Sequence, residues 1–317
     1  MPLKDLLESK KRLILFGGKG GVGKTTCAAA TALQFASHGR STLIISSDPT
    51  PSLSDIFETR IGDKEKRIRD VKNLHAVEIS SDIVLERWKK KFGPEIHDVI
   101  SSFIPVEYDF IEYIGKAPGI DEEFMLDYIL ELVENEKYDT IVWDTAPAGH
   151  TLRLLTLPTI FIDHLEEASN VYLKLHGYFE RIRKVFGLNR GKRSPLDIIE
   201  GWKGLAEEIL NLLKDKNKTE FVIVTIPEAL GVYQTERLID VTRDFGLRIN
   251  HMIVNNVIKD ADCDFHIARK EMQKKYIEFL EEKYGESMSI VYVYLYPHEI
   301  KGVERIMEVS QSLFSNH

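Results

Sequence analysis

The sequence predicts an α/β fold with a mostly parallel central sheet flanked by helices, and with an α-helical subdomain inserted into it. Three observations support this prediction: short apolar runs alternate with helical patterns, most of these runs are unbroken, and two long regions interrupt the alternation. Unbroken apolar runs are typical of parallel strands that are buried on both faces. Strands that alternate with helices are typical of βα units and therefore of a parallel sheet.

Seven segments are expected to be strands of the sheet domain, to which residues 1–81, 137–154 and 216–317 are assigned. No tandem repeat is present, which excludes a fused pair of such domains. The candidate strands, in chain order, are RLILFGG, STLIISSD, LHAVEIS, DTIVWDT, EFVIVTI, NHMIVNNV and SIVYVYLY.

The helical subdomain is assigned to residues 82–136 and 155–215, where apolar residues recur at steps of three and four. Such a pattern places the apolar side chains on one face of a helix. The second region also carries more apolar residues than one packing stripe uses, which is typical of an interaction site. We expect a groove here, although amphipathic helices also bury such faces against each other. The stripes are Leu85, Trp88, Phe92, Ile96, Val99 and Phe103 in the first region, and Phe161, Leu165, Ala168, Tyr172, Leu175, Phe179, Ile182 and Phe186 in the second.

Composition limits the classes of protein to consider. The 317 residues are 43% hydrophobic, so a packed core is expected, and the net charge of −8 argues against nucleic acid as a partner. Cys27 and Cys263 are the only cysteines, which fits a reducing compartment. No apolar run is long enough to cross a bilayer, and the first residues do not form a signal peptide. We therefore expect a cytoplasmic protein.

A glycine-rich loop predicts nucleotide binding. GKGGVGKT, residues 18–25, matches G-x-x-x-x-G-K-[ST] between a predicted strand and a predicted helix. Its backbone N–H groups would surround phosphate oxygens, Lys24 would reach the β- and γ-phosphates, and the Thr25 hydroxyl would hold Mg²⁺. The sequence thus predicts a P-loop NTPase. The expected nucleotide-binding residues of this segment are Gly17, Gly18, Lys19, Gly20, Gly21, Val22, Gly23, Lys24, Thr25 and Thr26.

Two aspartates follow predicted strands. Asp48 lies at the carboxyl end of the second strand, where ligands bind in parallel sheets, and could orient or deprotonate the water that attacks the γ-phosphate. The alternative is that Asp-Pro simply starts a turn. Asp144 follows the apolar residues IVW of a predicted strand, in the position of a Walker B aspartate. There it would contact Mg²⁺ directly or through water.

The motifs together resemble a known family. The segment KGGVGKTT, with its additional Lys19, is similar to the deviant Walker A group that includes MinD, ParA, nitrogenase iron protein and ArsA. The segments DPTPSLSD and DTAPAGHTLRLLTLP narrow the resemblance to the ArsA/GET branch, which includes arsenical-pump ATPases and ATPases that deliver tail-anchored proteins to membranes. Further matches in IPEALGVYQTERLI, VNNV and CDFHIARKEMQKKYI extend it over nearly the whole chain.

The resemblance implies a homodimeric ATPase that uses ATP and Mg²⁺. Lys19 would cross to the phosphates of the partner subunit, and Asp48 would be the catalytic aspartate. Glu228 and Asn255 would contact the nucleotide, and Pro297 would lie near the adenine. The helical subdomain would bind the C-terminal transmembrane helix of a client, whose membrane receptor the sequence does not identify.

The sequence departs from the targeting branch at two places. A Cys-x-x-Cys pair from each subunit usually holds zinc there, whereas Cys263 and His266 occupy these positions here. Two cysteines and two histidines from two chains would complete a tetrahedral Zn²⁺ site. The alternative is that Cys263 and His266 are ordinary polar residues before a helix. Thr50 and Pro51 stand where Ala-His is common, and we expect them to affect the coupling loop more than the chemistry.

Two other functions remain as alternatives. An ATPase that energises arsenite or antimonite export would need about three clustered thiolates, and the chain has two cysteines. A MinD-like positioning ATPase would need a basic amphipathic tail. Here Glu299, Glu304 and Glu308 offset the few bases of the C-terminal segment, which is expected to dock on its own domain.

Overall fold

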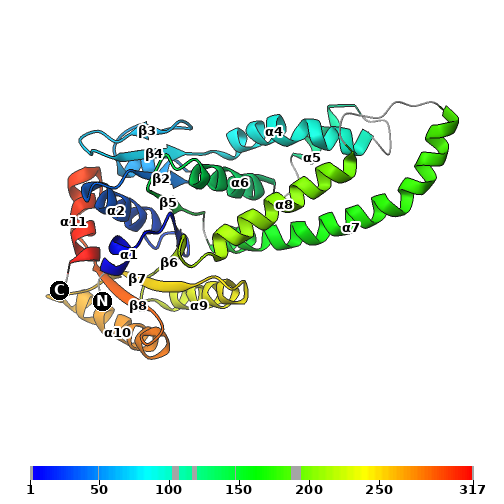
Figure 1. The fold of residues 1–317 in the computed structure, drawn as a ribbon. Coiled ribbons are helices and arrows are strands. Elements are labelled where there is room, and N and C mark those ends of the chain that lie inside the picture. Colours follow the sequence, from blue (N-terminus) through cyan, green and yellow to red (C-terminus); the bar gives the residue numbers. More distant parts are fainter. Residues whose placement is uncertain are drawn as a thin grey trace. The chain divides into compact units, whose positions relative to one another are not determined.

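The computed structural model describes residues 3–48, 50–101, 107–115, 120–146, 148–186 and 194–315. Within them, eight strands form a sheet in the order β3-β4-β2-β5-β1-β6-β7-β8, and helices cover the sheet. All neighbouring strands are parallel except β3 and β4. The predicted α/β fold with a mostly parallel sheet is therefore confirmed (Figure 1).

All seven predicted strands are present, and the structure adds an eighth. This strand, β3, was missed because it contains only two charged residues and pairs antiparallel with β4 at the sheet edge. The strands are β1 (Leu13–Gly17), β2 (Thr42–Ser46), β3 (Lys66–Arg67), β4 (Leu74–Glu78), β5 (Thr140–Asp144), β6 (Thr219–Thr225), β7 (Ile249–Val257) and β8 (Ser289–Tyr294).

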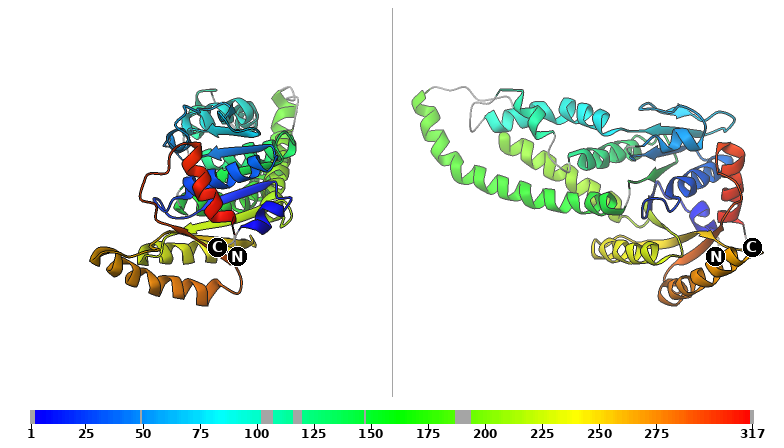
Figure 2. Two further views of the ribbon diagram at one scale, coloured as in Figure 1. Left: turned by 90° about the vertical axis from the view of Figure 1, so that its left-hand side faces the viewer. Right: turned by 180° about the vertical axis from the view of Figure 1, so that it is seen from behind.

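Helices lie on both faces of the sheet. On one face α2 and α11 pack together, and the ring of Phe35 on α2 meets the ring of Phe314 on α11 edge to face. Alanines on α2 allow it to approach the strands closely. The other face is covered by α9 and α10, which lie side by side (Figures 1 and 2). The helices around the sheet are α1 (Lys4–Glu8), α2 (Lys24–Ser37), α3 (Ser52–Ile56), α9 (Ala229–Asp244), α10 (Asp264–Tyr284) and α11 (Gly302–Phe314).

The chain divides into two compact units. Unit 1 consists of residues 1–80, 131–152 and 213–317 and contains the sheet, and unit 2 consists of residues 81–130 and 153–212. The described residues of unit 2 are helical or irregular. No described helix is long and apolar enough to serve as a membrane span. The remaining helices are α4 (Ser81–Ser101), α5 (Phe110–Ile114), α6 (Ile120–Glu134), α7 (Ala148–Phe186) and α8 (Pro195–Lys214).

The strand order brings three loops together at the carboxyl edge of the sheet. Strand β5 lies between β2 and β1, and Asp144 is in register with Ser46 on one side and Phe16 on the other. The loop that begins at Gly18 and the loop that carries Asp48 therefore flank Asp144. Ligands bind at this edge in open parallel sheets.

Candidate active site

Two glycines of the phosphate-binding loop lie so close to neighbouring atoms that a side chain would not fit. A Cβ atom on Gly18 would lie 2.2 Å from the Val224 carbonyl oxygen. Gly23 has a positive φ of 90° at the start of α2, and a Cβ there would lie 2.2 Å from Asn255 Nδ2. This same Nδ2 donates a hydrogen bond to the Val22 carbonyl at 2.9 Å. Asn255 thus supports the loop from the end of β7, and larger residues at either glycine would push the loop out of place.

Lys24 is buried at the first position of α2. Its Nζ donates a hydrogen bond of 3.4 Å to the Lys19 carbonyl oxygen. Burial lowers the pKa of Lys24, and the nearby carboxylates of Asp144 and Asp48 oppose this effect only in part. A buried ammonium with few acceptors is well suited to bind an anionic group such as a phosphate.

Asp144 and Thr25 meet at the end of β5. The Thr25 hydroxyl donates a hydrogen bond of 2.6 Å to Asp144 Oδ2, and Asp144 is only 1% exposed. Its Oδ1 has no hydrogen-bond partner among the described residues. Burial raises the pKa of Asp144 to about 6, although the bond from Thr25 and the charge of Lys24 act in the opposite direction. An unpartnered buried carboxylate oxygen beside a hydroxyl fits Mg²⁺, which prefers oxygen ligands.

Asp48 lies two residues beyond β2. Its Oδ1 accepts two hydrogen bonds from Thr50, from the backbone N–H at 2.9 Å and from Oγ1 at 2.6 Å. The first bond closes the turn that the alternative interpretation of Asp-Pro predicted. The carboxylate nevertheless lies just beyond the end of β2, the strand that pairs with β5. Thr50 contacts the candidate catalytic carboxylate itself, a contact that the sequence did not indicate.

Lys19 is half-buried, and no described residue forms a hydrogen bond or an ion pair with its ammonium group. Its neighbours Gly20 and Gly21 are exposed, and Thr26 is half-buried on the first turn of α2. Gly17 ends β1, where a Cβ would meet the Phe221 ring. The ammonium of Lys19 is therefore free to bind a group outside the described part of this chain.

Glu228 follows β6 and Pro297 follows β8, two strands that β7 separates in the sheet. Glu228 precedes α9 and pairs with Arg269 of α10, with 2.5 Å between Oε1 and Nη2. Nothing in the sequence indicated this pairing. Pro297 lines a pocket of about 800 Å³ beyond β7 and β8, together with Lys259 and Tyr296. This volume has room for a heterocyclic base.

Cys263 and His266 lie together at the start of α10. The distance between Cys263 Sγ and His266 Nδ1 is 3.5 Å. Asp262 also belongs to the group, with its Oδ1 3.2 Å from the same nitrogen, and the three donor atoms all lie within 4.8 Å of one another. Asp262 was not predicted as a ligand because its position does not match the Cys-x-x-Cys pattern.

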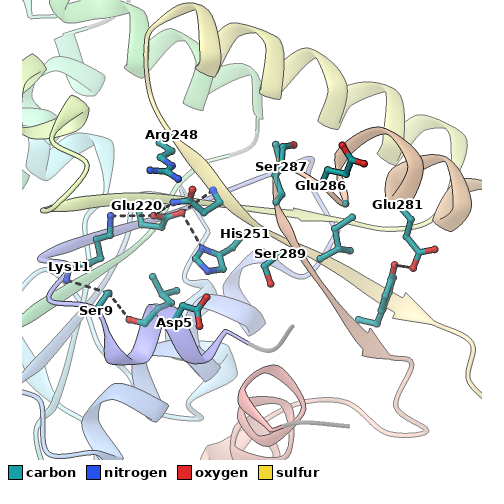
Figure 3. A pocket seen from close by; sticks show the side chains of 16 residues that line it. Asp5, Ser9, Lys11, Glu220, Arg248, His251, Glu281, Glu286, Ser287 and Ser289 are labelled. Carbon is teal, nitrogen blue, oxygen red and sulfur yellow. Dashed lines mark hydrogen bonds and ion pairs between the residues drawn. The ribbon is translucent and has the colours of Figure 1, made fainter.

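A polar pocket of about 760 Å³ lies at the opposite edge of the sheet, at the amino ends of β6, β7 and β8 (Figure 3). Its buried Glu220 carboxylate accepts hydrogen bonds from Asn250 Nδ2 at 2.7 Å and His251 Nδ1 at 3.1 Å, and Lys11 Nζ lies 3.4 Å away. Burial alone would raise the pKa of Glu220, but His251, Asn250 and Lys11 together outweigh it and leave the pKa lowered. The carboxylate is thus satisfied within the protein, and we interpret the cluster as stabilising the sheet edge.

Comparison with known proteins identifies a family. Residues 11–315 match the model of the anion-transporting ATPase family. The chain is 34% identical over 321 residues to ATPase ASNA1 homolog 1 of Paramecium tetraurelia, covering 98% of this chain and 95% of that protein. It is also 35% identical over 320 residues to ATPase get3 of Botryotinia fuckeliana, covering 99% and 93% of the two chains.

Proposed function

The chain belongs to the anion-transporting ATPase family and is an ATPase, and from this premise we propose that it is a homodimeric targeting factor of the cytoplasm. In this proposal it binds the C-terminal transmembrane helix of tail-anchored proteins and delivers them to a membrane. Unit 1 carries out ATP hydrolysis, and the helical subdomain, residues 82–136 and 155–215, holds the client.

The geometry at the carboxyl edge of the sheet supports a division of catalytic roles. Lys24 binds the β- and γ-phosphates, and Asp48 orients or deprotonates the attacking water. Lys19 has no partner among the described residues of its own chain, which supports its role at the phosphates of the partner subunit. Electrostatic stabilisation and positioning account for most of the catalysis in phosphoryl transfer, so each of these charges matters.

The residues at the end of β5 fit a magnesium ion. Thr25 Oγ1 and Asp144 Oδ1, which has no hydrogen-bond partner in the described part of the chain, are the oxygen atoms that would hold it, directly or through water. When bound, Mg²⁺ neutralises phosphate charge during phosphoryl transfer. Asn255 supports the loop beside it, and Glu228 and Pro297 would contact the nucleotide, with Pro297 near the adenine.

An apolar cavity in unit 2 is the observation that carries the client-binding proposal. It has a volume of about 270 Å³ and is lined by hydrophobic side chains of the five helices α4 to α8, among them Trp88, Phe92, Ile96, Phe161 and Trp202. The Trp202 N–H is already bonded to Glu95 at 2.8 Å, so the indole presents only apolar surface to the cavity. Cavities of this kind stay dry and accept apolar groups.

The size of the cavity defines what can enter it. A membrane helix is about 30 Å long and 10 Å across, or roughly 2,400 Å³, whereas a cavity of about 150 Å³ already binds benzene. We therefore propose that one or two bulky side chains of the client enter the cavity while its helix lies outside. Exposed Ile160, Val171 and Leu173 on α7, which are 45–57% exposed, supply further apolar surface.

Capture of a peptide with a single C-terminal membrane helix tests the proposal. We expect capture by the full chain to depend on ATP and to be unaffected by arsenite. A bromophenylalanine in the peptide should quench Trp88 and Trp202 when it enters the cavity, and it should not quench Trp143, which is buried in β5. Ile96→Trp, which fills the cavity, should weaken capture about tenfold or more.

The matched control is Leu230→Trp, the introduction of the same side chain at an exposed position of α9. It should leave capture unchanged. Absence of capture together with arsenite-stimulated ATP hydrolysis would contradict the targeting role and favour metalloid export. Capture without quenching would retain targeting and reject the cavity.

We also propose a Zn²⁺ site at the dimer interface, held by Cys263 and His266 of both subunits. A tetrahedral ion with typical Zn–N, Zn–O and Zn–S bonds separates its ligands by about 3.3 Å for N and O and about 3.5 Å for N and S. The distances of 3.2 Å from His266 Nδ1 to Asp262 Oδ1 and 3.5 Å to Cys263 Sγ match these values. The residues therefore fit the ion, and Asp262 is an additional candidate ligand.

Metal analysis of the purified protein tests the zinc site. A shared site predicts about one zinc per two chains, and a chelator should weaken the dimer. Cys263→Ser should lose the metal, while Cys27→Ser should keep it because Cys27 is buried elsewhere in the fold. One zinc per chain would place the ion on Asp262, Cys263 and His266 of a single subunit, and no zinc would reject the site.

Two observations weigh against the alternative functions. Burial raises the pKa of the Cys27 thiol to about 12, so Cys27 is a poor thiolate donor for a metalloid. Cys263 is then the one remaining cysteine of the sequence, whereas about three clustered thiolates are needed. The C-terminal helix α11 packs on α2 with Ile306, Val309 and Leu313 buried, so its apolar face is occupied within its own domain. A MinD-like membrane tail would need that face to be free.

A further inference from the structure

Thr50 makes a contact that a turn at Asp48 does not require. A turn started by an aspartate needs only the bond from the N–H two residues later, which any residue except proline can supply. Here the Thr50 hydroxyl donates a second bond to the same Oδ1 at 2.6 Å. This distance is typical of a hydroxyl bound to a carboxylate, which is stronger than a bond between neutral groups.

The surrounding backbone holds both partners of this contact. The Asp48 N–H donates to Ser46 Oγ at 3.2 Å, and the Thr50 carbonyl accepts a bond from the Ser52 N–H at 2.7 Å. The two serine hydroxyls lie 3.3 Å apart. Both residues are therefore tied to the end of β2 and to the start of α3, and the hydroxyl can fix the carboxylate relative to the sheet.

The contact makes the two oxygens of Asp48 inequivalent. Oδ1 accepts two donors from Thr50, whereas Oδ2 has no hydrogen-bond partner among the described residues. A carboxylate whose rotation is restricted in this way presents one oxygen in a defined direction. An in-line attack on phosphorus needs the water in a defined orientation, and a small misplacement lowers the rate strongly.

We propose that Thr50 is a positioning residue for ATP hydrolysis: its hydroxyl holds Asp48 Oδ1 so that Oδ2 faces the attacking water. This inference rests on the proposed role of Asp48. Thr50 itself is exposed and touches neither the phosphate-binding loop nor the magnesium ligands through any described hydrogen bond. Its effect should therefore be on turnover and not on the affinity for nucleotide.

Steady-state kinetics of two variants tests the proposal. Thr50→Val has the same shape but no hydroxyl, and we expect kcat to fall roughly tenfold or more, with KM for ATP and nucleotide affinity within about twofold of the parent. Thr50→Ser restores the hydroxyl and should recover turnover to within about twofold. Thr59→Val is the matched control, since Thr59 lies three residues beyond α3 and its hydroxyl makes no described hydrogen bond.

Three results would overturn the role of Thr50: unchanged or faster turnover in Thr50→Val, an equal loss in Thr50→Ser, or a loss that appears in KM alone. Full turnover of Asp48→Asn is a different failure, because it removes Asp48 from catalysis and the role of Thr50 with it. If Asp48→Asn is inactive while Thr50→Val is normal, the catalytic aspartate stands and only the positioning residue is wrong.

Discussion

Asp48→Asn is expected to lower ATP turnover by about 10³-fold or more while leaving ATP binding intact, because general-base catalysis contributes roughly 10²–10⁴-fold. The amide can accept a hydrogen bond from Thr50 as the carboxylate does, but it cannot take a proton from water. Steady-state hydrolysis measures the loss, and binding of a fluorescent ATP analogue measures affinity.

Asp55→Asn is the matched control for this variant. Asp55 is an exposed aspartate of the following helix α3, so the same chemical change there should leave turnover unchanged. Turnover in Asp48→Asn within about tenfold of the parent would remove Asp48 from the role of base or water-orienting group. Loss of nucleotide binding would instead assign Asp48 to binding.

Lys19→Ala is expected to lower turnover by about 10³-fold or more, the effect of removing a charge that is supplied in trans to a phosphoryl-transfer site. The distinctive result comes from mixing it with Asp48→Asn. A heterodimer then has one intact site, built from the Asp48 of one subunit and the Lys19 of the other. Random pairing makes half of the dimers heterodimers, so an equal mixture should regain about one quarter of the parent turnover.

Lys24→Ala mixed with Asp48→Asn is the control. Lys24 lies in the loop of its own site, where Asp48 and Asp144 of the same chain act on its charge. Neither site of that heterodimer is intact, so the mixture should show no recovery. Recovery in this control, or none in the Lys19 mixture after subunit exchange has been verified, would contradict the assignment of Lys19 to the partner's site.

The phosphate-binding loop and seven strands were predictable because their signals are local. A strand buried on both faces appears as a short apolar run, and the glycine-rich loop has a fixed spacing that ends in Lys24 and Thr25. Asp144 was placed at a strand end by the same pattern, and the register of β5 with β1 and β2 brings it to that loop. The strand β3 has no such pattern and was missed.

Contacts between side chains were decided by the tertiary structure. Glu228 pairs with Arg269, which lies 41 residues later in the chain, and the Asn255 amide reaches the Val22 carbonyl across 233 residues. The cavity of unit 2 likewise depends on how five helices pack, which a helical repeat does not specify.

The sequence by itself determined a P-loop on a parallel sheet, because backbone conformation and strand burial follow from local residue patterns, and the resemblance of its motifs to a known family implied an ATPase. Only the tertiary structure decided which oxygen of Asp48 is held by Thr50, which oxygen of Asp144 has no hydrogen-bond partner within the described residues, and where unit 2 keeps an apolar cavity. The physical reason is that hydrogen bonds and cavities depend on distances of a few tenths of an ångström between segments that the chain brings together only on folding.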